Sequence, residues 1–118
     1  MSRDDAYVLD MIRFAREVIE LSSGVTRDEY VSNLGKRRSI ERSLELIGEA
    51  ARRVSSPFRE DHPEIPWRDI IGQRSVLAHD YGDVNDERVW ETARERVPDL
   101  LGALERLVKP EGQLRVEE

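Results

Sequence analysis

Cysteine is absent from this chain of 118 residues, and histidine occurs only twice. The lack of cysteine excludes disulfides, thiolate zinc sites, iron–sulfur clusters and cysteine nucleophiles, and two histidines are too few for a histidine-rich metal site. Aromatic residues make up only 6% of the chain, and no apolar run approaches the roughly 18 residues that a membrane span needs. No apolar segment follows the first five residues, Met1 to Asp5, so we expect no signal peptide. These absences predict a soluble, cytoplasmic protein.

Charged residues are abundant instead. They make up 37% of the chain, and 25 acidic residues against 19 basic ones give a net charge of −6. This acidic balance argues against a broad surface for binding nucleic acid. The length predicts a single domain over residues 1–118, because domains usually contain about 100–150 residues.

Apolar residues recur at spacings of three and four along the chain, which is the period of amphipathic helices. The first predicted helix runs from about residue 4 to residue 23, with Asp4 or Asp5 as its N-cap and Gly24 as its stop. A second apolar stripe lies beside the main one and contains Tyr7, Phe14 and Leu21. Two interpretations of this stripe stay open, a broad face buried inside the protein or a dimer interface.

Local signals predict the next two helices. Thr26 and Glu29 have the spacing of a capping box, so a second helix starts there. Asn33 and Gly35 shorten it. The third helix fades at the two serines before Pro57, and its apolar stripe consists of Ile40, Leu44, Ile47, Ala51 and Val54.

Prolines divide the second half of the chain. Three of them exclude a helix interior over residues 57–66. Pro66 suits the first turn of a fourth helix, predicted over residues 67–80. A last helix is predicted to start near Asn85 and to be kinked by Pro98.

No strand pattern or internal repeat interrupts these helices. The sequence therefore predicts an all-α fold, a compact antiparallel bundle of four to five helices around a pair of long ones. We expect the folded core to span residues 4–108 and residues 109–118 to form a polar tail.

The residues best suited to chemistry gather near the end of the fourth predicted helix, where the sequence places Arg74, His79, Asp80 and Tyr81. Arginine is a permanently charged, forked donor for phosphate oxygens. The ordinary pKa of histidine lies near neutrality, so His79 can take a proton from a ribose 2′-hydroxyl or give one to a leaving oxygen. An arginine and a histidine suffice in principle for cutting RNA without a metal.

Helix geometry restricts how this pair can act. Residues five apart on a regular helix differ by about 140° in direction and about 7.5 Å in height, so Arg74 and His79 do not share a face. Three arrangements stay open: a helix that loosens near His79, an Arg74 side chain that wraps, or two copies that meet at a twofold axis. The alternative is structural, with His79 at the helix C-terminus and Tyr81 packed under the next turn. No metal-ligand spacing occurs on one helical face, so we expect no metal site and no cofactor.

A second feature is basic and lies on the third predicted helix, where Lys36, Arg37, Arg38 and Arg42 occur close together. These residues are candidates for contacts to an RNA backbone. The alternative is an ordinary charged helix face, because several glutamates are interleaved with them.

Three segments together resemble the HepT-like family of HEPN-domain toxins. They are residues 39–51 (SIERSLELIGEAA), 63–67 (PEIPW) and 74–81 (RSVLAHDY). The last segment matches the family's motif of an arginine, four residues, a histidine, one residue and a tyrosine. The resemblance extends from Asp5 to about Val108.

The resemblance implies a HEPN-like helical bundle that forms a homodimer and places two copies of the motif in one cleft. It implies a metal-independent endoribonuclease that cuts cellular RNA, either tRNA or mRNA. Arg74 and His79 would be its catalytic pair. Ser75 and Asp80 are taken as supporting residues, although Ser75 departs from the asparagine or aspartate that often follows the motif arginine.

The resemblance also implies a partner, a cognate minimal nucleotidyltransferase (MntA-like) that acts as the antitoxin of a type II/VII-like toxin–antitoxin pair. It would transfer AMP from ATP to Tyr81, which would add negative charge beside the catalytic pair and repel the RNA phosphate. Toxin and antitoxin would form a larger hetero-oligomer.

Two other functions compete with this one. The chain could be a catalytically silent HEPN-like binding and regulatory partner of a nucleotidyltransferase, which would bind that partner or a nucleotide without cutting RNA. It could also be a structural dimerisation domain, in which mutation of Arg74 or His79 would change stability more than growth inhibition.

Overall fold

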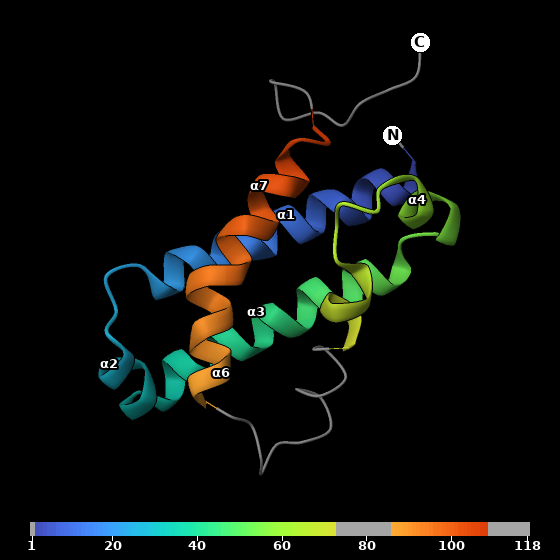
Figure 1. The fold of residues 1–118 in the computed structure, drawn as a ribbon. Helices are drawn as coiled ribbons and strands as arrows, with labels where there is room; N and C mark the ends of the chain where they lie inside the picture. The colour runs from blue at the N-terminus through green and yellow to red at the C-terminus, as the bar shows by residue number, and fades with distance from the viewer. Residues whose placement is uncertain (1, 73–85, 109–118) are drawn as a thin grey trace.

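The computed structural model describes residues 2–72 and 86–108, and every regular element in these two ranges is a helix. The predicted all-α bundle is therefore confirmed. Two long helices, α1 (Arg3–Ser22) and α3 (Leu34–Arg53), lie side by side and run in opposite directions (Figure 1). They are the predicted pair of long helices. The predicted tail, residues 109–118, lies outside the described residues.

A short helix, α2 (Arg27–Ser32), connects the two long ones. The capping box predicted for it is present, with the Glu29 amide donating to Thr26 Oγ1 at 3.1 Å and the Thr26 amide donating to Glu29 Oε1 at 3.2 Å. Asn33 ends α2 and caps α3 through its side chain, which accepts from the Lys36 amide at 2.9 Å. Gly35 lies inside α3, so the prediction that it shortens the second helix is wrong.

The N-cap predicted for α1 was also wrong. Ser2 is the N-cap, and its hydroxyl accepts from the Asp5 amide at 3.1 Å while Asp5 accepts from the Ser2 amide. This capping box moves the helix start toward the N-terminus and puts Asp5 at its third position. The predicted stop is confirmed, because Gly24 has a φ of 71°, a conformation that glycine adopts without strain.

The region with three prolines contains a helix that the sequence reading excluded, α4 (Ser56–Asp61). Pro57 lies in its first turn, where the missing N–H has no helical partner to lose. Ser55 caps the helix and also joins it to the start of α1, since its amide and hydroxyl contact the Asp4 carboxylate at 2.8 and 2.6 Å.

The last helix is present but irregular. It consists of α6 (Asp86–Glu91), a π-helical stretch at Thr92–Arg96 labelled η2, and α7 (Val97–Glu105), which follow one another as one bent column (Figure 1). Pro98 lies in the first turn of α7 and cannot donate to a carbonyl of the turn before it. A kink was predicted at Pro98, and the structure has a wider π-helical turn directly before this proline.

The core lies between α1, α3 and this column. The second stripe of α1 is half-buried and packs against the core, which favours the broad buried face over the alternative. The fully buried side chains include Met11 and Val18 of α1, Ile40 of α3, Tyr30 of α2 and Leu104 of α7.

Candidate functional site

The five motif residues of the predicted site, namely Arg74, Ser75, His79, Asp80 and Tyr81, lie outside the described residues. Their roles stay predictions. The structure does describe the helical segments that precede and follow residues 73–85 in the chain.

The segment before the motif is anchored to the core. Residues 67–72 are helical, as predicted from Trp67 onward. The Trp67 side chain is 8% exposed, its indole N–H donates to the His62 carbonyl at 2.9 Å, and the Phe58 ring meets it edge-on at 6.4 Å between centroids. The His62 ring is half-buried and packs on the Phe58 ring, with 4.4 Å between the ring centroids.

The segment after the motif is α6, and other helices hold its first turn. Asp86 lies 3.8 Å from Arg37 Nε of α3, and Glu87 lies 3.2 Å from Arg27 of α2. Both acidic residues also suit the positive end of the helix dipole. One turn later the Trp90 ring packs against Tyr30, with 5.3 Å between the ring centroids.

Tyr30 is fully buried where α2, α3 and α6 meet. Burial raises the pKa of its phenol, and the nearby carboxylates of Glu41 and Asp86 raise it further. Among the described residues, neither the Tyr30 hydroxyl nor Glu41 Oε2 has a hydrogen-bond partner. In the sequence, the proximity of Tyr30 and Glu41 is indicated only by the position of Glu41 beside Ile40 of the apolar stripe of α3.

The four basic candidates on α3 differ in their surroundings. Arg38 bonds Glu41 at 3.0 Å, Arg42 contacts Glu45 at 3.4 Å, and Arg37 faces Asp86. These pairs favour the charged-helix alternative over a row of arginines directed at a phosphate backbone. Lys36 is half-buried beside them.

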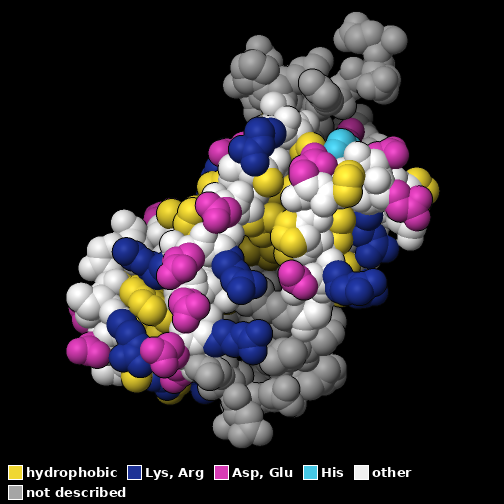
Figure 2. All heavy atoms as spheres, viewed as in Figure 1, with side chains coloured by type: hydrophobic (Ala, Val, Ile, Leu, Met, Phe, Trp, Pro, Cys, Tyr) yellow, Lys and Arg dark blue, Asp and Glu magenta, His cyan; other side chains and the backbone are white. Residues whose placement is uncertain are grey.

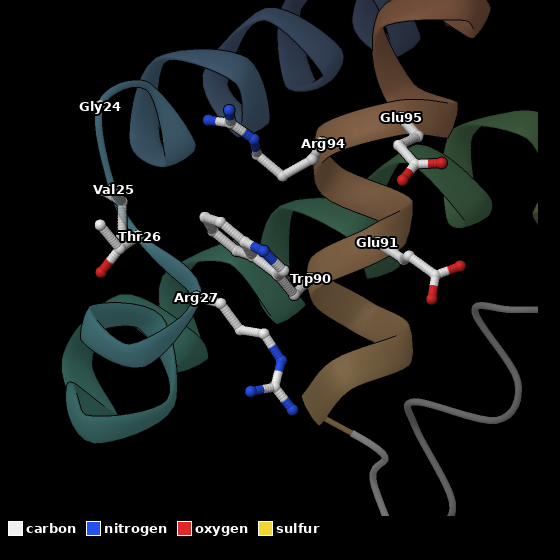
Figure 3. A pocket seen from close by; sticks show the side chains of 8 residues that line it. All are labelled: Gly24, Val25, Thr26, Arg27, Trp90, Glu91, Arg94 and Glu95. Atoms are coloured by element: carbon white, nitrogen blue, oxygen red, sulfur yellow. The ribbon is translucent and has the colours of Figure 1, made fainter.

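A surface hollow of about 640 Å³ lies between the loop after α1 and the α6–η2 part of the column (Figure 3). Two arginines and two glutamates line it, so its charges balance. The Trp90 ring in its wall already contacts Tyr30 and the Arg94 guanidinium, which lies 5.3 Å from the ring centroid. Arg94 also donates to the Ser22 carbonyl at 3.0 Å. The hollow therefore offers no uncommitted aromatic face or arginine pair for a nucleotide.

The face shown in Figure 2 carries basic and acidic side chains intermixed, with apolar side chains between them. It is not a uniformly basic surface. Within residues 2–72 and 86–108, no group of three or more potential metal ligands comes together. No helix in these ranges is both long enough and apolar enough to cross a membrane.

By its fold the chain is an all-α helical-bundle protein. A family model described as "Ribonuclease HepT-like" matches residues 11–107. The chain belongs to this ribonuclease family, as the motif segments suggested.

Three relatives illustrate the similarity. A "Putative RNase" of Methanocaldococcus jannaschii is 34% identical over 102 residues, which cover 85% of this chain and 94% of the relative. A "Probable ribonuclease HepT" of Thermococcus cleftensis is 35% identical over 104 residues, with 85% and 94% covered. A "Putative RNase" of Caldanaerobacter subterraneus is 32% identical over 105 residues, with 89% and 94% covered. No solved structure gave a significant match.

Proposed function

We propose that this chain is a metal-independent endoribonuclease and the toxin of a two-component toxin–antitoxin pair in the cytoplasm. Its membership of the ribonuclease HepT-like family carries the proposal. The arginine–histidine–tyrosine motif at residues 74–81 supports it, since it is the sequence's best set of groups for phosphodiester cleavage. The substrate is cellular RNA, either tRNA or mRNA.

In this proposal His79 is the general acid and base. The ribose 2′-oxygen loses its proton to an imidazole and attacks the adjacent phosphorus, while the bond to the 5′-oxygen breaks and that oxygen receives a proton. Arg74 donates to the phosphate oxygens, where negative charge accumulates in the transition state. Ser75 and Asp80 support the pair.

The active unit is a homodimer of single-domain chains. Arg74 and His79 point in different directions on a regular helix, and a twofold axis would supply a histidine and an arginine from two copies to one cleft. Such a narrow cleft is compatible with the net charge of −6, because it needs only a local positive field.

The antitoxin is a nucleotidyltransferase that modifies Tyr81. The tyrosine oxygen attacks the α-phosphorus of ATP, pyrophosphate leaves, and the tyrosine proton passes to solvent. The attached AMP carries negative charge and bulk into the cleft, so it repels the RNA phosphate and blocks access.

A cleavage assay on tRNA and mRNA in the presence of EDTA tests the catalytic proposal. The parent protein should cut RNA, and His79→Ala should lose at least about a hundredfold in rate, the usual contribution of general acid–base catalysis. Equal cleavage by both proteins would contradict the assignment of His79. No cleavage by the parent, together with binding to a nucleotidyltransferase, would support the silent regulatory partner instead.

The modification is tested by intact mass after incubation with ATP and the nucleotidyltransferase encoded beside this chain. The mass of the parent should rise by whole AMP units, and Tyr81→Phe should stay unmodified. A rise that survives the Tyr81→Phe change would exclude this tyrosine as the acceptor.

A further inference from the structure

Three helices meet at a junction that includes the start of α6, the first described element after the motif in the chain. This junction consists of Tyr30 from α2, Arg37 and Glu41 from α3, and Asp86 and Trp90 from α6. Asp86 is the first residue of α6 and the seventh residue after His79 in the sequence.

Arg37 differs from the other arginines of the basic segment. Its side chain is 20% exposed, whereas those of Arg38 and Arg42 are 57% and 64% exposed. Its Nη1 donates to the Val31 carbonyl near the end of α2, and its Nε lies 3.8 Å from Asp86 Oδ2. One guanidinium therefore connects α2, α3 and the start of α6.

The other two arginines are paired within their own helix. Arg38 contacts Glu41 three residues later, and Arg42 contacts Glu45 at the same spacing. Both pairs are intrahelical contacts three residues apart, so neither of them joins α3 to another helix. Arg37 is the arginine of this segment whose side chain contacts two other helices directly.

The first turn of α6 depends on such contacts from other helices. Asp86 is the first residue of α6, and its carboxylate forms an ion pair with Arg37. The Trp90 ring fixes the next turn against Tyr30. The ion pair and the ring contact thus tie the first two turns of α6 to other helices.

We propose that Arg37 is a positioning residue that acts through Asp86 to fix the start of α6, and that it is not a contact to RNA. The inference rests on the proposed ribonuclease function, because it concerns the geometry of that reaction. The contacts to Val31 and Asp86 engage Nη1 and Nε, and the side chain is only 20% exposed, so Arg37 is less accessible to a phosphate than Arg38 or Arg42. Small displacements of catalytic groups lower rates strongly, by about a hundredfold for 1 Å.

The experiment compares the parent with Arg37→Gln, Asp86→Asn and the double variant in steady-state cleavage of one RNA at several salt concentrations. Arg53→Gln is the matched control, since it removes a 3.0 Å ion pair with Glu49 within α3 and touches neither α2 nor α6. Each junction variant should lower kcat by about tenfold. The double variant should lose no more than either single one, because both changes break the same contact.

The salt dependence separates positioning from RNA binding. Loss of a phosphate contact would raise KM in Arg37→Gln and reduce the slope of log KM against log salt by about 0.7 for single-stranded RNA. That result, with an unaffected Asp86→Asn variant, would overturn the proposal. Unchanged kcat in both junction variants would overturn it too, as would a loss of activity fully explained by a smaller folded fraction.

Amide hydrogen exchange separates this inference from the proposed function. If the parent does not cut RNA, the proposed function fails, while exchange in the first turn of α6 still reports on the Arg37 contact. Faster exchange there in Arg37→Gln than in Arg53→Gln supports the inference. Equal exchange in the two variants refutes it.

Discussion

At the scale of single residues, Tyr30 combines full burial with a polar group that the described structure leaves without a hydrogen-bond partner. An unpaired buried hydroxyl costs stability, because it gives up hydrogen bonds to water without replacing them. The aromatic ring compensates through burial and its contact with Trp90. Tyr30 is therefore valuable for its ring and not for its hydroxyl.

Tyr30→Phe should leave the free energy of unfolding at pH 7 unchanged or raise it by about 1 kcal/mol. The substitution keeps the ring and removes the unpaired hydroxyl. Urea denaturation followed by circular dichroism measures the difference between the parent and the variant. A loss of more than about 1 kcal/mol would show that the hydroxyl has a stabilising partner.

The same pair of proteins should differ in their response to alkaline pH. The pKa of Tyr30 is raised in the folded state, so the phenol contributes stability that is fully present below the ordinary tyrosine pKa of about 10. Above that pH the unfolded chain loses the proton first, and this contribution declines as the pH approaches the folded pKa. Between pH 9 and 11 the parent should therefore lose stability faster than Tyr30→Phe, and parallel curves would contradict the raised pKa.

At the scale of helices, the sequence predicts the start of α2 correctly, whereas it misplaces the N-cap of α1 and misses α4. The capping box at Thr26 and Glu29 was predicted because it involves only neighbouring residues. The prediction of no helix over residues 57–66 treats Pro57 as a helix breaker, but Pro57 lies in the first turn of α4, where a proline removes no helical hydrogen bond. The contact that holds α4 to α1 joins Ser55 and Asp4, 51 residues apart, and no local pattern shows it.

Ser55→Ala should lower the free energy of unfolding by about 1 to 2 kcal/mol. The change removes the cap of α4, where the hydroxyl accepts from the Phe58 amide at 3.3 Å, and the 2.6 Å bond to Asp4. Thermal or urea unfolding measures the effect. The control is Ser39→Ala, an exposed serine on α3 whose loss should change stability by less than about 0.5 kcal/mol. Equal effects of the two substitutions would show that the α4 cap contributes nothing.

At the scale of the whole molecule, the proposed twofold cleft requires Arg74 and His79 to work together across two chains. Arg74→Ala and His79→Ala should each be inactive alone. When they are unfolded and refolded together, half of the dimers should be mixed. Each mixed dimer should keep one of the two arginine–histidine pairs that the parent dimer forms between its chains. The mixture should recover about a quarter of the parent's activity in the cleavage assay.

An inactive mixture would contradict cooperation between chains. Sedimentation of the mixture must show dimers, so that failure to associate is distinguished from cooperation within one chain. His79→Ala alone, unfolded and refolded in the same way, provides the background rate.

The sequence by itself determined the helical class, most helix boundaries and the family, because amphipathic periods, caps and the motif segments are local patterns along the chain. Only the tertiary structure decided what the charged residues contact. Lys36 to Arg38 look equivalent in the sequence, yet Arg37 alone reaches Asp86, a residue 49 positions away. Helix packing decides this, because it brings α2, α3 and α6 together around the buried Tyr30 ring.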